Sequence, residues 1–363
     1  MSTIKKNPEL ATLATPARQR RGHGRATLQD VAERAGVTAI TVSRFLRAPA
    51  VVAPETAQRI EAALAATGYV PNKQAGQLAS GHSRMVAAII PSIANSIFAE
   101  TVQGLSDGLQ EAGYELLLAS TGYSREREQA QVRAVLGWFP SALVVTGRHH
   151  SAAALTLLRA AQAAQTPVVE IWDQQPERLS NGFAQVGFNH ADVGAAMAAH
   201  LLGRGHRRLA YVDSGVGEDF RAHERGKGFV MAAEAAGAAV LHRTAQPGDA
   251  FDAGRRALAG LLPAGDARDA KAVTAIAFAN DNFACGALLE ARERGLEIPR
   301  QLAIMGFGDF EIGRQLRPAL STIRPPRYDI GRRAAALLLA ALEHGTPLTA
   351  QPLPWELLPR GST

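Results

Sequence analysis

The side chains best suited to chemistry near the start of the chain are Thr41, Ser43 and Arg44, in the stretch LQDVAERAGVTAITVSRFL at residues 28–46. Hydroxyl and guanidinium groups donate hydrogen bonds to phosphates and to the edges of bases. Residues 1–84 carry twelve Lys and Arg against five Asp and Glu, whereas the rest of the chain carries 27 against 28. The excess positive charge of the first quarter indicates a polyanionic partner or, alternatively, a solvated basic tail.

A three-helix unit over residues 26–70 would position these side chains. Thr27 is suited to cap the first helix, with Asp30 three residues on in a capping box, and Thr38 is suited to cap the second. Gly36 permits the left-handed backbone of the tight turn between them. Such a helix pair is typical of helix-turn-helix motifs, although an ordinary helical hairpin gives the same pattern.

The third helix of this unit would start at Pro54 and end at Gly68, which suit the first helical position and the C-cap. Ile60 and Leu64 would pin it to the other two helices. The remaining positions expected in this small core are Val31, Val37, Val42 and Leu46.

The segment YVPNKQAGQLASGHS, residues 69–83, predicts a hinge. Pro71 stops the preceding helical pattern, and Asn72 can cap a helix of only about seven residues, 73–79. A helix so short, with Gly76 inside it, is unstable alone. We therefore expect it to form only when something holds it.

From Met85 onward, apolar runs alternate with amphipathic stretches. Strands are expected at 85–90, 115–120, 142–146, 167–172, 207–212, 273–279 and 302–307, and helices at 97–112, 125–138, 191–202 and 282–294. This alternation indicates parallel sheets covered on both faces. About 280 residues exceed one comfortable sheet, so we expect two such lobes.

Composition argues against several classes of protein. No run of about 18 apolar residues occurs, and the first residues lack the apolar core of a secretory signal, so we expect no membrane span and a cytoplasmic protein. The single cysteine, Cys285, excludes an internal disulfide and a Cys-rich metal site. Phosphate-loop, GxGxxG and GxSxG motifs are absent, and the histidines lack zinc spacing. We therefore expect no enzyme activity, no catalytic residues, no metal and no cofactor.

The stretches TLQDVAERAGVTAITVSRFL (27–46) and VAPETAQRIEAALAATGYVPNKQAGQLA (52–79) resemble the lactose-repressor (LacI/GalR) family of bacterial transcription regulators. The resemblance runs from about Ala26 to the end of the chain. It implies a small all-α helix-turn-helix head plus an α/β effector domain of two parallel-sheet lobes, similar to periplasmic binding proteins. The expected parts are a disordered basic tail at 1–25, the DNA-binding head at 26–71, a hinge helix and linker at 72–84, and the effector-binding and dimerisation domain at 85–363.

By this resemblance, the head and the hinge bind double-stranded DNA. The implied DNA-binding residues are Thr27, Thr38, Ala39, Ile40, Thr41, Ser43, Arg44, Asn72, Ala75 and Leu78. Ala39 and Ile40 can make only apolar contacts, for example with a thymine methyl group. Leu78 would wedge into the minor groove and kink the DNA, unless it packs on its own domain. Two hinge helices must pack together there, which implies a homodimer on a near-palindromic operator.

The resemblance also implies an effector pocket between the lobes. The implied lining residues are Asn95, Phe98, Arg148, His149, Trp172, Arg225, Asp281 and Phe307. Arg225 lies on the Arg-x-x-Gly-Phe pattern whose arginine anchors the ligand, and Asp281 would accept hydrogen bonds from ligand hydroxyls. The alternatives are a salt bridge that ties up Arg225 and Asp281, and a purely structural role in the core for Phe98 and Trp172.

The segments IMGFGDF (304–310) and VVEIWD (168–173) look like the gluconate-utilisation branch of the family, and Gly308 replaces the polar residue usual at its position. We therefore expect a transcriptional repressor of an operon for gluconate or a related sugar acid, released from DNA by a small carbohydrate or sugar-acid effector. Two alternatives stay open. One is a corepressor-dependent regulator with a different ligand, and the other is a cytoplasmic sugar-binding protein.

Overall fold

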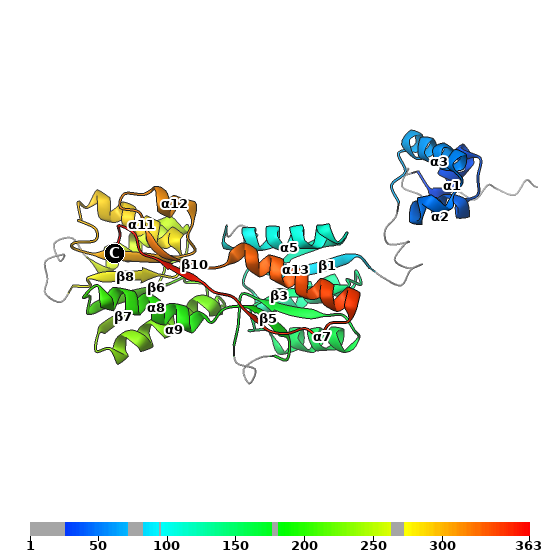
Figure 1. Ribbon diagram of the computed structural model, residues 1–363. Helices are drawn as coiled ribbons and strands as arrows, with labels where there is room; N and C mark the ends of the chain where they lie inside the picture. Colours follow the sequence, from blue (N-terminus) through cyan, green and yellow to red (C-terminus); the bar gives the residue numbers. More distant parts are fainter. Residues whose placement is uncertain (1–25, 72–82, 94–95, 176–180, 263–271) are drawn as a thin grey trace, which may run out of the picture. The chain divides into compact units, whose positions relative to one another are not determined.

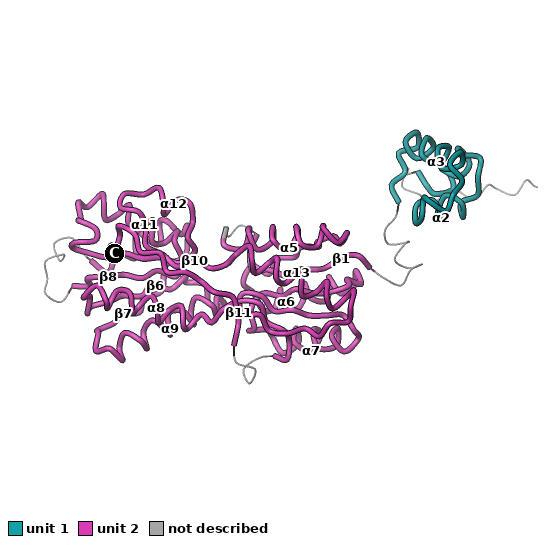
Figure 2. The backbone as a smooth tube through the Cα atoms, viewed as in Figure 1, with its two compact units in different colours: residues 1–81 teal, residues 82–363 magenta. Residues whose placement is uncertain are grey.

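The computed structural model describes residues 26–71, 83–93, 96–175, 181–262 and 272–363. The chain divides into two compact units, residues 1–81 and residues 82–363, which Figure 2 shows in different colours. The described part of the first unit is helical, and the second unit is built on two β-sheets. Within the described ranges, no helix combines the length and the apolar character that crossing a membrane requires.

The first unit is a three-helix bundle with the expected capping residues. Its elements are α1 (Leu28–Ala35), α2 (Ala39–Arg47), the 3-10 turn η1 (Pro49–Val51) and α3 (Pro54–Thr67). The Thr27 hydroxyl accepts a hydrogen bond from the backbone N–H of Asp30, and the Asp30 carboxylate accepts one from the backbone N–H of Thr27. Gly36 has a φ of 64°, the left-handed conformation that the tight turn needs. The predicted capping box and turn are confirmed.

Apolar side chains from all three helices form the core of this head. The buried members are Val31, Ala32, Ala35, Val42, Phe45, Ile60 and Ala63. Val37 and Leu46, also predicted in the core, lie partly buried against them. In contrast, the Ile40 side chain is 70 % exposed. Helix α2 therefore buries one face and presents another to solvent.

The first lobe of the second unit contains a parallel sheet. Its strands, in spatial order, are β11 (Gln351–Pro352), β5 (Ala184–Gly187), β4 (Val168–Ile171), β3 (Ala142–Thr146), β1 (Met85–Ile90) and β2 (Glu115–Ser120). Its helices are η2 (Ser96–Phe98), α5 (Ala99–Glu111), α6 (Arg125–Leu136), α7 (Ala152–Ala163) and α13 (Arg327–His344). Strand β1 pairs in parallel with β2, with Met85 opposite Glu115.

The second lobe repeats this architecture. Its strands, in spatial order, are β12 (Glu356–Leu358), β10 (Ser321–Arg324), β9 (Ala303–Phe307), β8 (Ala275–Phe278), β6 (Arg208–Asp213) and β7 (Ala239–Thr244). Its helices are α8 (His190–Gly203), α9 (Phe220–Ala235), α10 (Ala250–Leu261), α11 (Asp281–Glu293) and α12 (Glu311–Gln315). Only β12 runs antiparallel to its neighbour among the pairings described.

Helices cover both faces of each sheet, which explains the continuous apolar character of the strands. In β1, Val86 and Ala88 belong to one apolar cluster, which also contains Leu105 of α5. Ala87 belongs to another cluster, with Val132 of α6. Successive side chains of a strand point to opposite faces, so each face receives its own helical layer.

The described chain passes between the two lobes three times. The connections are residues 188–189 before α8, 325–326 before α13 and 353–355 before β12. Figure 1 shows α13, coloured orange, beside α5 of the first lobe, although β10 directly before it belongs to the second. Each lobe is therefore completed by segments that are distant in sequence.

Glycines bring two helix pairs into direct backbone contact. A Cβ atom at Gly194 of α8 would lie 1.9 Å from the carbonyl oxygen of Arg225 in α9. A Cβ atom at Gly331 of α13 would lie 2.1 Å from the carbonyl oxygen of Thr101 in α5. No side chain fits at such distances, so α8 fixes the backbone of Arg225 directly.

Candidate ligand pocket and DNA-binding head

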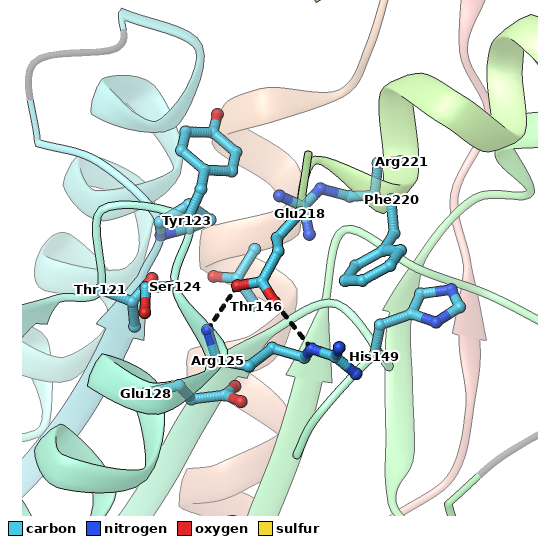
Figure 3. A pocket seen from close by; sticks show the side chains of 11 residues that line it. Thr121, Tyr123, Ser124, Arg125, Glu128, Thr146, His149, Glu218, Phe220 and Arg221 are labelled. Atoms are coloured by element: carbon cyan, nitrogen blue, oxygen red, sulfur yellow. Dashed lines mark hydrogen bonds and ion pairs between the residues drawn. The ribbon is translucent and has the colours of Figure 1, made fainter. Parts of the chain in front are cut away.

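A pocket lies between the lobes, at the carboxyl ends of parallel strands, where ligands bind in open α/β sheets. We call it the inner pocket; it is lined by Phe98, Trp172, His190, Arg221, Arg225, Asn280 and Phe307, among others. A second hollow, the polar pocket, shares Tyr123 and Arg221 with it. Figure 3 shows the polar pocket, with Thr121, Ser124, Glu128 and Thr146 from the first lobe and Glu218 and Phe220 from the second.

Arg225 is the central cation of the inner pocket. Its side chain is buried, with Nη1 3.0 Å from His190 Nδ1 and Nη2 donating to the carbonyl oxygen of Ala279 at 2.9 Å. Its guanidinium carbon lies 3.9 Å from the centre of the Phe307 ring, in a cation–π contact. Its Nε has no hydrogen-bond partner within the described residues. Arg225 is therefore rigidly held and still has a donor to offer.

His190 holds Arg225 as a neutral imidazole. Its Nε2 lies 2.7 Å from the carbonyl oxygen of Trp172, so Nε2 carries the proton and Nδ1 accepts the hydrogen bond from Arg225. Burial, followed by the charges of Arg225 and Arg221, holds the pKa of His190 well below its ordinary value. No sequence motif pointed to His190. Its place in the first turn of a helix that follows a strand was the available signal.

Arg221 is a second buried cation, one helical turn before Arg225, and sequence analysis missed it. Its guanidinium carbon lies 5.8 Å from the centre of the Phe98 ring. Among the described residues, the ion pairs at this cleft involve Arg125 and Arg148 rather than Arg221 or Arg225. Two buried guanidinium groups that form no ion pair among the described residues can bind an anion. Their i, i+4 spacing could have revealed Arg221.

Arg148 and His149, both predicted effector ligands, are engaged by Glu224 of α9. The Glu224 carboxylate forms an ion pair with Arg148 and lies 2.9 Å from His149 Nε2. The hydrogen bonds and charges of these two residues outweigh burial and lower the pKa of Glu224. Arg148 was predicted to be a cation available to the effector, but Glu224 neutralises its charge. His149 stays at the wall of the polar pocket, stacked on Phe220.

Asp281 is turned away from the inner pocket, which corrects its predicted place. Its carboxylate is fully buried and accepts hydrogen bonds from Thr322 Oγ1 at 2.6 Å and from the backbone N–H of Phe310 at 2.7 Å. Burial raises the pKa of Asp281 to about 6, although these hydrogen bonds oppose the rise. Its neighbour Asn280, which caps α11, lines the pocket instead. Asp281 and Arg225 form no salt bridge with each other in the described structure.

Phe98, Trp172 and Phe307 form the apolar wall of the inner pocket. All three are buried, and the rings of Phe98 and Trp172 meet edge to face with centres 5.4 Å apart. The Trp172 indole N–H donates to Thr101 Oγ1 at 3.1 Å. The three rings therefore belong to the core and to the pocket wall together.

Asp173 is a fully buried carboxyl group beside the cleft. Its Oδ2 and Arg221 Nη1 both flank Gly147, 3.3 and 2.6 Å from where a Cβ of Gly147 would lie. Burial raises the pKa of Asp173 to about 7, although the charge of Arg221 opposes the rise. Asp173 is thus poised between its neutral and charged forms near neutral pH.

Buried polar atoms without hydrogen-bond partners gather at this cleft. Within the described residues, they are Glu128 Oε2, Arg148 Nε, both carboxyl oxygens of Asp173, Glu224 Oε2 and Arg225 Nε. Buried polar groups are nearly always paired, so such a cluster is evidence for a ligand site. Carboxylate oxygens accept from hydroxyl donors, and guanidinium N–H groups donate to anions and hydroxyl oxygens. A polyhydroxylated acid offers both kinds of group.

The structure places part of the predicted DNA-binding set on one surface of α2. Ile40 and Arg44 are exposed, and Ala39, Thr41 and Ser43 are half-buried. Thr27 and Thr38 cap α1 and α2, and the Thr38 hydroxyl accepts from the backbone N–H of Thr41 at 3.2 Å. The predicted residues Asn72, Ala75, Leu78 and Asn95 lie outside the described residues.

Comparison with known proteins matches both units. A model of bacterial regulatory proteins of the lacI family matches residues 27–72, and a model of the periplasmic binding protein-like domain matches residues 198–363. Fold and pocket together define a transcription regulator with a helix-turn-helix head and a two-lobed ligand-binding domain.

Full-length relatives give the same result. The HTH-type transcriptional regulator GntR of Pseudomonas aeruginosa is 39 % identical over 345 residues, 94 % of this chain and 96 % of the relative. The regulator IdnR of Escherichia coli is 34 % identical over 88 % of this chain and 93 % of its own length. A LacI family regulator from Silicibacter pomeroyi has a solved structure with a TM-score of 0.84 and 33 % identity, covering 93 % of this chain and 99 % of that one. The chain belongs to the LacI family and is a DNA-binding transcriptional regulator, as predicted.

Proposed function

We propose that this regulator represses a sugar-acid utilisation operon and leaves its operator when an acid of the gluconate class binds between the lobes. The pair Arg221 and Arg225 carries the proposal, because both guanidinium groups are buried and neither forms an ion pair among the described residues. A carboxylate ligand would supply the missing charge. Phe98, Trp172 and Phe307 would cover the carbon chain of the ligand.

The proposed site differs from the predicted one at four positions. Arg221 and Asn280 enter it because they line the inner pocket, and Arg148 leaves it because Glu224 neutralises its charge. Asp281 leaves it because its carboxylate is bonded within the second lobe. Asn95 stays in the proposal on the strength of the sequence alone.

The proposed DNA contacts combine the exposed surface of α2 with the hinge residues inferred from the sequence, Asn72, Ala75 and Leu78. Ile40 and Arg44 are the most accessible of the described candidates. We further propose a homodimer that acts in the cytoplasm on a near-palindromic operator, as a regulator rather than an enzyme. The names of the relatives as transcriptional regulators support the role of a regulator.

The test uses the full-length protein and a near-palindromic site selected from random DNA, with binding read by fluorescence anisotropy. D-Gluconate should release the DNA. D-Glucitol has a similar hydroxyl chain but no carboxylate, so it should leave the complex intact. Equal release by both compounds would remove the role of the two arginines, and tighter DNA binding with D-gluconate would identify a corepressor instead.

A further inference from the structure

The polar pocket contains a carboxylate that a neighbouring histidine holds in place. Glu128 of α6 lines this pocket and is 8 % exposed. Its Oε1 lies 2.6 Å from His150 Nδ1, whereas its Oε2 has no hydrogen-bond partner within the described residues. Figure 3 shows Glu128 close to Ser124 and Arg125 among the lining side chains. One carboxylate oxygen is therefore engaged and the other lacks a donor.

A second glutamate fixes His150. His150 Nε2 lies 3.2 Å from Glu170 Oε1. The fully buried Glu170 also accepts hydrogen bonds of 2.6 Å from the side chains of Asn181 and Gln185. Burial lowers the pKa of His150, but the hydrogen bonds and charges of Glu128 and Glu170 outweigh it and raise this pKa to about 9. His150 is thus protonated at neutral pH and donates from both ring nitrogens. The chain Glu170–His150–Glu128 leaves Glu128 little freedom to turn.

Two hydrogen-bond donors of the polar pocket already have partners. Arg125 Nε donates to Glu218 Oε1 at 3.0 Å, and the Thr146 hydroxyl donates to the carbonyl oxygen of Ile89 at 3.1 Å. A buried carboxylate oxygen without a donor is unfavourable. A ligand hydroxyl would relieve this at Glu128 Oε2, whereas a ligand anion would be repelled there.

We propose that Glu128 binds hydroxyl groups at the end of the effector remote from its carboxylate, with His150 and Glu170 as positioning residues. Arg221 lines both pockets, so an acid anchored at Arg221 and Arg225 extends its chain toward Glu128. This assignment rests on the proposed function and adds an orientation to it. It makes Glu128 the residue that distinguishes long sugar acids from short ones.

The test compares two acids on the full-length protein, D-gluconate with six carbons and D-glycerate with three. Binding of the weaker ligand is read by displacement in titration calorimetry. Glu128→Gln keeps the shape of the side chain and its contact with His150, but replaces the free oxygen by an N–H donor. This substitution should lower the affinity for D-gluconate about tenfold or more and change the affinity for D-glycerate by less than about twofold. Glu126→Gln, at an exposed position of the same helix, should change neither.

His150→Ala should reproduce this length-selective loss, because Glu128 would no longer be held, whereas a merely structural role would weaken both acids alike. If Glu128→Gln lowers the melting temperature, Glu128→Asp, which keeps the charge but withdraws the oxygen, should show the same selectivity. Unchanged D-gluconate affinity in the Glu128 variants, or equal loss for both acids, overturns the assignment while the proposed function stands. Failure of the wild-type protein to bind either acid overturns both.

Discussion

His190 Nδ1 accepts a hydrogen bond from Arg225 Nη1 over 3.0 Å, so a neutral imidazole orients the main cation of the inner pocket. The other imidazole nitrogen is bonded to the carbonyl oxygen of Trp172, which ties this orientation to a residue of the pocket wall. The guanidinium of arginine offers five N–H donors in a rigid planar fork, and the compact ammonium of lysine cannot reproduce that geometry.

Arg225→Lys should therefore lower effector affinity by about 30-fold or more, because hydrogen bonds to charged groups contribute about 1.5–3 kcal/mol each. Titration calorimetry with D-gluconate measures this loss, and operator binding without effector should stay unchanged. Arg243→Lys is the matched control, since Arg243 is exposed on the edge strand β7. Normal release of the mutant from DNA at wild-type effector concentrations would exclude Arg225 from the site.

Gly194→Ala should displace Arg225 through a clash with its backbone. The added Cβ would meet the carbonyl oxygen of Arg225, so α8 and α9 must separate, with a loss of about 1–3 kcal/mol in the free energy of unfolding. Effector affinity should fall as Arg225 moves. Urea unfolding and calorimetry measure the two effects.

Gly203→Ala, at the end of the same helix, is the control. A Cβ there has no neighbour within 4 Å, so the change should be neutral or stabilise by up to about 1 kcal/mol. Equal behaviour of the two alanine variants would show that the contact between α8 and α9 carries no strain.

Asp173 should make the stability of the ligand-binding domain depend on pH. Its pKa is raised from the ordinary 3.8 to about 7 in the folded protein, so the folded state keeps a proton that the unfolded chain has lost. This stabilising contribution is complete below about pH 4 and is lost as the pH rises through 7. Asp173→Asn removes this titration. Its free energy of unfolding relative to that of the wild type should therefore rise by about 2–3 kcal/mol from pH 5 to pH 8.

Urea unfolding of both proteins at pH 5 and pH 8 measures this gain. The wild-type protein controls for every other titrating group, including Glu170 and Glu224 nearby. A difference between the two proteins that stays constant over this range would mean that Asp173 keeps an ordinary pKa.

Ile40 and Val42 are close neighbours on α2 with opposite surroundings. Ile40→Ala should weaken operator binding by about 1–3 kcal/mol through lost base contacts and leave the melting temperature of the head unchanged, because its side chain is 70 % exposed. Val42→Ala should instead destabilise the head by about 1–3 kcal/mol, since Val42 is fully buried. Anisotropy and thermal unfolding separate the two, and unchanged operator binding by Ile40→Ala would contradict the proposed DNA contact.

The regular elements were more predictable than the pocket. The apolar runs at 85–90 and 115–120 coincide with β1 and β2. Strand β1 is almost entirely buried, as expected of an unbroken apolar run, whereas β2 is a half-buried edge strand. Strand β7, at a sheet edge with mostly exposed side chains, has no such pattern and was missed. Strand β5 was missed because its sequence, AQVG, is not an apolar run.

The chemistry of the pocket depends on partners that are distant in sequence. Arg225 was identified, but the loss of Arg148 as a free cation depends on Glu224, which follows it by 76 residues. Asp281 turns inward because Thr322, 41 residues later, donates to it from a neighbouring strand. Sequence patterns show which residues end strands, and tertiary packing decides which of their side chains remain available.

The triple passage of the chain between the lobes has a consequence for fragments of this protein. A proteolytic nick at residues 188–189 would leave α5 on one piece and α13 on the other, and these helices touch backbone to backbone at Gly331 and Thr101. A nick at residues 325–326 would leave a piece that still pairs with both sheets through β11 and β12. The ligand-binding domain should therefore survive cleavage at either connection as an associated pair of fragments, because in both cases the piece that carries strands β1 to β5 of the first lobe lacks α13 and β11.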